Sequence, residues 1–103
     1  MWYSVSTFAV AQRDQHSVKE PLWEEQIFLV DAESENDAKH KAELLAQRDE
    51  CEYTVRNGSS LTWRFNCVSK VYKLPDEDIR DGVEIFSRFL KDSEAKSLLN
   101  PIE

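Results

Sequence analysis

Residues Leu22–Val30 read LWEEQIFLV, a largely apolar stretch with two glutamates near its start. Apolar residues stand at both odd and even positions, which predicts a strand that is apolar on both faces. Neighbouring side chains of a strand point to opposite faces, so Glu24 and Glu25 cannot share one. One of them must therefore lie on the core side, either as a working carboxylate or as the solvent-reaching rim of a small sheet.

The segment before this stretch has the same character. Residues 2–13 (WYSVSTFAVAQR) are rich in β-branched and aromatic types, and both alternating sets are largely apolar. Polar residues follow and end in Pro21, which indicates a loop. We predict two central strands, 2–13 and 22–32, that need cover on both faces.

A helix is predicted directly after the second strand. Ser34 is suited to cap its first N–H groups, and Asp37 stands three residues later, where a capping-box glutamate would be. Apolar residues then recur at helical spacing up to a predicted end near Asp49. Most of them are alanines, so this helix should lie close to the sheet.

A hairpin is predicted next, from residues 51–57 and 61–67. Each run alternates, and the side chains predicted to point inward are Cys51, Tyr53, Val55, Leu61, Trp63, Phe65 and Cys67. Because directly opposed residues share a face, the two runs need a loop of odd length. A loop over Gly58–Ser60 would pair Tyr53 with Phe65 and Cys51 with Cys67. A bulge is expected near Val68, where the alternation becomes unclear.

The remaining segments give weaker patterns. Residues 75–82 (PDEDIRDG) indicate an acidic turn, and Val83–Leu90 combines strand-like with helix-like spacing. We predict a short strand running into a helical turn for Val83–Leu90. Asp92–Asn100 is predicted to form a short, frayed helix that Pro101 ends. The chain is thus read as one domain over 1–91 and a tail over 92–103.

These elements predict the α+β class. The expected architecture is a mainly antiparallel sheet of four or five strands with one main helix on one face, in the order β-β-α-β-β-(β/α). One helix covers only one face of a sheet whose first two strands are apolar on both. The second face then needs Val83–Leu90, the tail or another copy of the protein, and an exposed apolar face marks an interaction site.

Composition limits the function classes. The 103 residues carry a net charge of −7, and residues 51–74 are the one basic segment, so no nucleic-acid partner is expected. Two glycines are too few for a phosphate-binding loop. We find no signal peptide and no apolar run of membrane-spanning length, which favours the cytoplasm and reduced cysteines.

No catalytic or metal-binding motif is present. His16 and His40 share no ligand spacing with the cysteines, and the acidic stretch Asp76–Gly82 departs from a calcium loop at several positions. We therefore predict no catalytic residue, no metal and no cofactor. Catalytic groups meet in space rather than in sequence, so enzyme activity stays open, with the balance against it.

Four stretches together resemble a known family: MWYSVS at the start, LWEEQIFLV with the following DAES, Thr62-Trp63, and DGVEIFSRFL. They are similar to a family of small bacterial proteins called domain of unknown function 4288. The resemblance covers residues 1–90. It implies a small α+β domain and no assigned activity, so no catalytic residue is carried over.

Candidate site residues fall into three sets. A pocket of Trp23, Glu25 and Arg88 would hold a carboxylate whose pKa is raised by desolvation. Arg56 and Arg64 are expected on one outer face as an anion-facing pair. Aromatic side chains dominate binding hot spots, so the candidate interaction anchors, which ordinary core packing would equally explain, are Trp2, Trp23, Trp63, Phe86 and Phe89.

Three functions follow. The leading hypothesis is a non-catalytic interaction module that associates with itself or with another protein, with a homodimer as the expected form. The second is a small-molecule binder or enzyme built around Trp23, Glu25 and Arg88. The third is an accessory or inhibitory partner of a basic protein, which low salt would hold and high salt would release.

Overall fold

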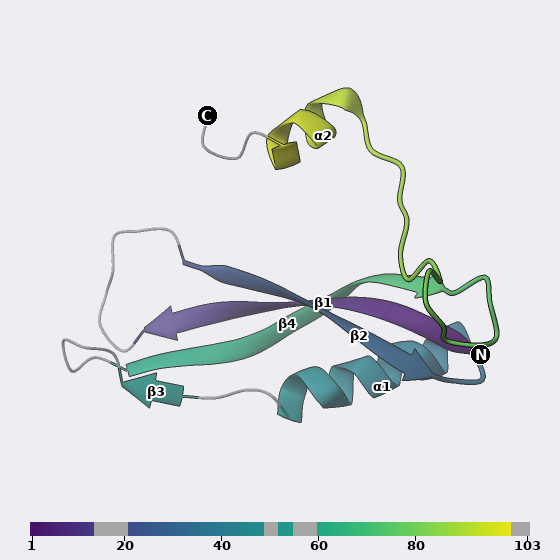
Figure 1. The fold of residues 1–103 in the computed structure, drawn as a ribbon. Helices are drawn as coiled ribbons and strands as arrows, with labels where there is room; N and C mark the ends of the chain where they lie inside the picture. Colours follow the sequence, from purple (N-terminus) through teal and green to yellow (C-terminus); the bar gives the residue numbers. More distant parts are fainter. Residues whose placement is uncertain (14–20, 49–51, 55–59, 100–103) are drawn as a thin grey trace.

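The computed structural model describes residues 1–13, 21–48, 52–54 and 60–99. Its elements in chain order are β1 (Trp2–Arg13), β2 (Trp23–Asp31), α1 (Glu35–Arg48), β3 (Glu52–Thr54), β4 (Ser60–Lys73) and α2 (Asp92–Leu99) (Figure 1). The predicted α+β class is confirmed, and so are the first two strands and the main helix within a residue or two of their predicted ends.

The strands form one antiparallel sheet in the order β2-β1-β4-β3. The central strand β1 pairs with β2 from Trp2 opposite Asp31 to Val10 opposite Trp23. β2 is an edge strand, so the prediction that residues 22–32 form a central strand is wrong.

β4 carries two bulges against β1. Asn66 and Ser69 are the extra residues, since β1 offers no partner for either in the register. The predicted bulge near Val68 is therefore confirmed. Each extra residue shifts the alternation by one and moves the following side chains to the other face. Cys67 consequently lies on the opposite face from Phe65 and is exposed, so the prediction that the two share a face is wrong.

The predicted hairpin register is also wrong. Tyr53 lies opposite Leu61 instead of Phe65, and Thr54 lies opposite Ser60, which already belongs to β4. The parity is as predicted, but the pairing is displaced by four residues along β4. Cys51 lies outside the described residues, and so the predicted pairing of the two cysteines does too.

Local hydrogen bonds fix the start of α1 as the sequence predicts. The Asp37 N–H donates to Ser34 Oγ at 3.1 Å, and the Ala38 N–H donates to the Ser34 carbonyl at 2.9 Å. Asp37 Oδ2 accepts in return from the Glu33 N–H at 3.3 Å. This reciprocal pair fixes the direction in which α1 leaves β2.

α1 covers one face of the sheet, which we call the covered face. The alanines of α1 allow close approach, and the residues buried together there are Tyr3, Val5, Val30, Ala32, Ala38 and Ala42. Phe28, Leu45, Val68 and Val71 pack around them. This is the hydrophobic core of the described structure.

The C-terminal part does not cover the other face. Val83–Leu90 forms neither strand nor helix, so the prediction of a short strand running into a helical turn is wrong. A turn precedes this segment, with Gly82 at a φ of 89° that favours glycine. The chain then rises on the side of the sheet opposite α1, and α2 stands away from the strands (Figure 1).

Candidate functional site

The uncovered side of the sheet, which we call the open face, is the main candidate surface. The strand registers place alternate residues of β1, β2 and β4 on it. They are Trp2, Ser4, Ser6, Phe8, Val10, Trp23, Glu25, Ile27, Leu29, Asp31, Arg64, Cys67, Lys70 and Tyr72. The side chains of β2 dominate its apolar part.

Ser4 and Ser6 are small residues at the centre of the open face, where β1 runs between β2 and β4. Ser4 lies between Leu29 and Tyr72, and Ser6 lies between Ile27 and Lys70. Both serines are almost completely buried. Ser4 Oγ has no hydrogen-bond partner in the described structure, and a buried hydroxyl without a partner is unusual.

Large apolar side chains of β2 lie beside these serines. Trp23, Ile27 and Leu29 are 49%, 51% and 43% exposed. The Trp23 ring meets the Phe8 ring edge to face, with 6.5 Å between their centroids. Exposed apolar side chains of this kind on a sheet face, here with Glu25 between Trp23 and Ile27, are typical of an interaction site.

The two glutamates lie on opposite faces, as the alternation predicts. Glu24 stands opposite Ala9 on the α1 side, and Glu25 stands opposite Phe8 on the open face. Both are exposed. Ser6 Oγ donates a hydrogen bond to Glu25 Oε2, which holds the carboxylate beside Ser6. Both positions fit the interpretation that these glutamates reach solvent at the rim of the sheet.

A second aromatic contact attaches the C-terminal segment to the open face. The Tyr72 and Phe86 rings lie 5.8 Å apart, and the Arg88 guanidinium lies 5.9 Å from the Phe86 centroid. The Tyr72 hydroxyl donates to Glu84 Oε1. This hydrogen bond raises the pKa of Tyr72 above its ordinary value, and a weaker one with Ser87 partly offsets the rise.

The other predicted site residues are scattered. Arg88 contacts Phe86, whereas Glu25 contacts Ser6, so these contacts do not join the two members of the predicted pocket. Trp2 lies on the open face and Trp63 on the α1 side, both half-buried. Phe89 is fully exposed. Arg64 lies on the open face opposite Val10, and Arg56 lies outside the described residues.

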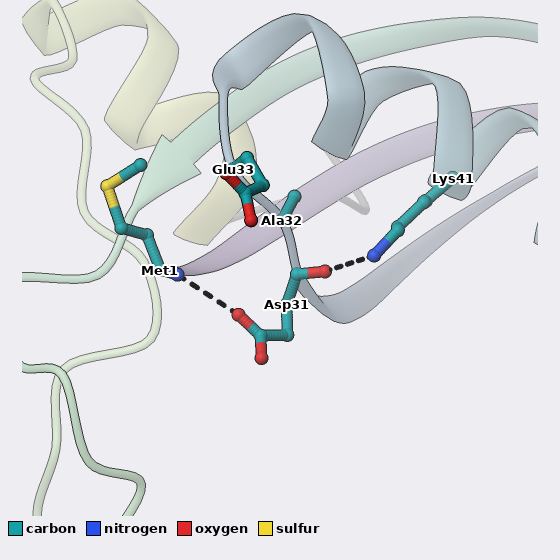
Figure 2. A pocket seen from close by; sticks show the side chains of 5 residues that line it. All are labelled: Met1, Asp31, Ala32, Glu33 and Lys41. Carbon is teal, nitrogen blue, oxygen red and sulfur yellow. Dashed lines mark hydrogen bonds and ion pairs between the residues drawn. The ribbon is translucent and has the colours of Figure 1, made fainter.

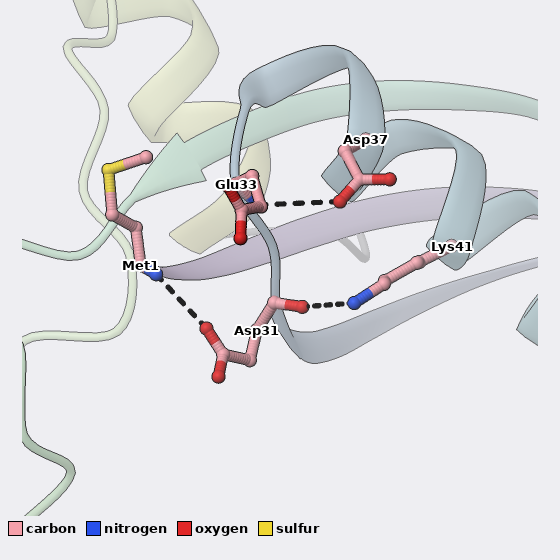
Figure 3. A network of polar contacts seen from close by, with 5 residues as sticks. All are labelled: Met1, Asp31, Glu33, Asp37 and Lys41. Carbon is pink, nitrogen blue, oxygen red and sulfur yellow. Dashed lines mark hydrogen bonds and ion pairs between the residues drawn. The ribbon is translucent and has the colours of Figure 1, made fainter.

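A shallow pocket of about 330 Å³ lies where β1 begins and β2 ends (Figure 2). The Met1 ammonium lies 3.0 Å from Asp31 Oδ1, and Lys41 Nζ reaches from α1 to the Asp31 carbonyl (Figure 3). Glu33 completes a lining with two positive and two negative groups. These charges balance, and the Met1 and Lys41 groups already contact Asp31. We therefore interpret the pocket as a structural joint between the sheet and α1.

An apolar groove runs beside this joint, between α1 and the β2 edge. It measures about 520 Å³ and is lined by Val30, Asp31, Lys41, Leu44, Leu45 and Arg48. Its floor belongs to the core, since Val30 is buried there. No group of three metal-ligating side chains gathers anywhere in the described ranges, and no helix among them is long and apolar enough to cross a membrane.

Sequence reasoning missed the serines, Tyr72 and Cys67 as members of the open face. For the last two, the phase depends on the bulge residues of β4, which no local pattern identifies. For Ser4 and Ser6, two serines inside an otherwise apolar strand were the available signal.

These features define a small α+β domain with one sheet, one covering helix and one open apolar face. The chain belongs to the family described as domain of unknown function (DUF4288), whose match spans residues 2–87. This confirms the resemblance found in the sequence. Neither the curated proteins nor the solved structures gave a match.

Proposed function

We propose that this chain is a non-catalytic protein-interaction module that forms a homodimer through the open face. The observation that carries the proposal is the apolar ridge of Trp23, Ile27 and Leu29, each about half exposed on a face that no described helix or strand covers. A second copy packed on this ridge would cover it with apolar surface, as α1 covers the other face.

Two more observations support the proposal. Trp23 is already held by the Phe8 ring, so little side-chain entropy is lost when a partner contacts it. The exposed thiol of Cys67 on the same face suits a reducing compartment, which is why we place the protein in the cytoplasm.

The test is the oligomeric state of the full chain, measured by light scattering after size exclusion. Ile27→Lys places a charge in the ridge and should convert a dimer to a monomer. Glu24→Lys is the matched control, because it adds a lysine to the same strand on the opposite face and should leave the dimer intact. A wild-type monomer at high concentration would contradict the proposal.

Salt distinguishes this proposal from binding to a basic protein. Two copies that each carry a net charge of −7 repel one another, so screening should strengthen a dimer held by apolar contacts. A complex held by opposite charges would instead weaken as salt rises. Dimerisation that weakens steeply with salt would count against the apolar interface.

A further inference from the structure

The segment Val83–Leu99, which we call the C-terminal arm, exposes its own apolar side chains. Phe89 is fully exposed, and Leu98 and Leu99 of α2 are 57% and 78% exposed. α2 buries no residue and makes no contact with the sheet or α1. An isolated helix of eight residues is unstable in water, so α2 needs a surface to pack on.

The arm leaves the domain from the open face. Tyr72, which holds Phe86 and Glu84, lies opposite Ser4 on that face. Beyond this attachment the arm continues on the same side of the sheet, away from α1 (Figure 1). The two uncovered apolar surfaces of the chain therefore lie on one side of the molecule.

The exposed area of the chain is larger than a compact monomer allows. A folded 12.0 kDa chain exposes about 6,000 Å². This chain exposes 8024 Å². Its radius of gyration is 16.6 Å, against about 13 Å for a compact chain of this length. The chain thus exposes about 2,000 Å² more than a compact chain of its mass.

We propose that the arm of each copy lies across the open face of a second copy, in a two-fold exchange. This inference rests on the proposed homodimer and specifies how that dimer is built. Phe89, Leu98 and Leu99 of one chain would cover the ridge of Trp23, Ile27 and Leu29 in the other. The exchange is self-complementary, as a two-fold interface requires, and covers both surfaces at once.

The arm is long enough to span an open face, and its composition favours the face of a second copy over its own. Fully extended, Val83–Leu90 reaches about 26 Å, close to the roughly 30 Å length of the nine-residue strand β2. To lie on its own sheet, the arm would have to turn back toward the strands, from which α2 stands away (Figure 1). The arm contains neither glycine nor proline, the residues that most readily form such reversals.

A complementation experiment tests the exchange. One variant carries Phe89→Glu with Leu98→Glu, which disables the arm but keeps the open face. The other carries Ile27→Lys, which disables the face but keeps the arm. Ser97→Glu, at an exposed polar position of α2, is the control for added negative charge. Native mass spectrometry reports the species in each variant alone and in an equimolar mixture.

We expect each disabled variant alone to dissociate with a Kd at least about thirtyfold above that of the wild type, as loss of hot-spot side chains causes. The mixture should form a heterodimer, because one intact arm can lie on one intact face. The control should dimerise like the wild type.

Two results would overturn the exchange and leave the homodimer standing. In the first, the arm variant dimerises like the wild type while Ile27→Lys does not. In the second, the wild type dimerises but the two variants are monomeric both alone and mixed, which shows that one intact arm and one intact face do not suffice for association. A monomeric wild type would remove the homodimer and the exchange together.

Discussion

The two faces of the sheet use the same three strands in different ways. On the covered face, Val5 and Val30 pack against alanines of α1, and both are almost completely buried. On the open face, nearly buried serines alternate with half-exposed Trp23 and Leu29. The covered face packs against a helix of the same chain. The open face keeps exposed apolar side chains that no described helix or strand covers.

This difference separates two meanings of an apolar residue. A residue of the covered face contributes to the stability of one chain, whereas in the proposed homodimer a residue of the open face contributes to association. Adjacent residues of β2 alternate between the two roles, so paired substitutions one position apart can test the distinction.

The strongest contrast is expected at Leu29 and Val30. Val30→Asp buries a charge without a partner in the core, so we expect it to lower the free energy of unfolding by at least about 3 kcal/mol. Leu29→Asp places the same charge on the open face and should leave a folded monomer. Urea unfolding followed by circular dichroism separates the two, and equal destabilisation would erase the distinction between the faces.

A smaller contrast is expected along β1. Val5→Ala removes buried methyl groups and leaves a cavity, which costs about 2–3 kcal/mol of unfolding free energy. Val10→Ala makes the same change at a partly exposed position on the open face. It should cost less than about 1 kcal/mol. The comparison fails if Val10→Ala proves as damaging as Val5→Ala in a dilute sample.

Two serines offer a third contrast. Ser34→Ala removes the hydroxyl that caps α1 and should lower the unfolding free energy by about 1 kcal/mol. Ser4→Ala removes a buried hydroxyl that has no partner, so it should leave stability unchanged or raise it slightly. Thermal unfolding of both variants beside the wild type checks the order. A marked loss for Ser4→Ala would show that this hydroxyl gains a partner in solution.

The smallest effect concerns pH and the attachment of the arm. The hydrogen bond to Glu84 raises the pKa of Tyr72, so its stabilisation is complete below the ordinary tyrosine pKa of about 10. It is lost as pH rises through the raised pKa, because the phenolate cannot donate. We expect proteolysis of the arm to increase in that range.

Ultraviolet titration of the tyrosines measures this shift. Tyr72→Phe identifies the late-titrating group, and Glu84→Gln removes the negative acceptor and should bring its pKa down. Identical titration curves for Glu84→Gln and the wild type would show that the hydrogen bond does not hold the arm.

Local patterns were sufficient for β1, β2 and α1. Alternation, a capping serine and alanines at helical spacing each act over a few neighbouring residues, and each predicted its element. The separation of Glu24 from Glu25 followed from the same alternation. These parts of the fold and of the candidate site could be predicted because neighbouring residues determine them.

The failures depend on contacts distant in sequence. The face of Cys67 is set by Asn66, whose bulge is defined against β1, and the register of Tyr53 is set by the same long-range sheet. The contact of Arg88 with the Phe86 ring is described by the structure, and the predicted pocket of Arg88 with Glu25 stays a prediction. Val83–Leu90 has strand-like residues but pairs with no strand of the described sheet.

The edge position of β2 gives its glutamates a protective role. An unpaired edge strand exposes a row of N–H and C=O groups that further copies can extend into a fibril. In a parallel stack each residue meets its own copy about 4.8 Å away, so Glu24 and Glu25 would form two ladders of like charge. The acids in LWEEQIFLV thus discourage amyloid growth from a strand whose other residues favour it.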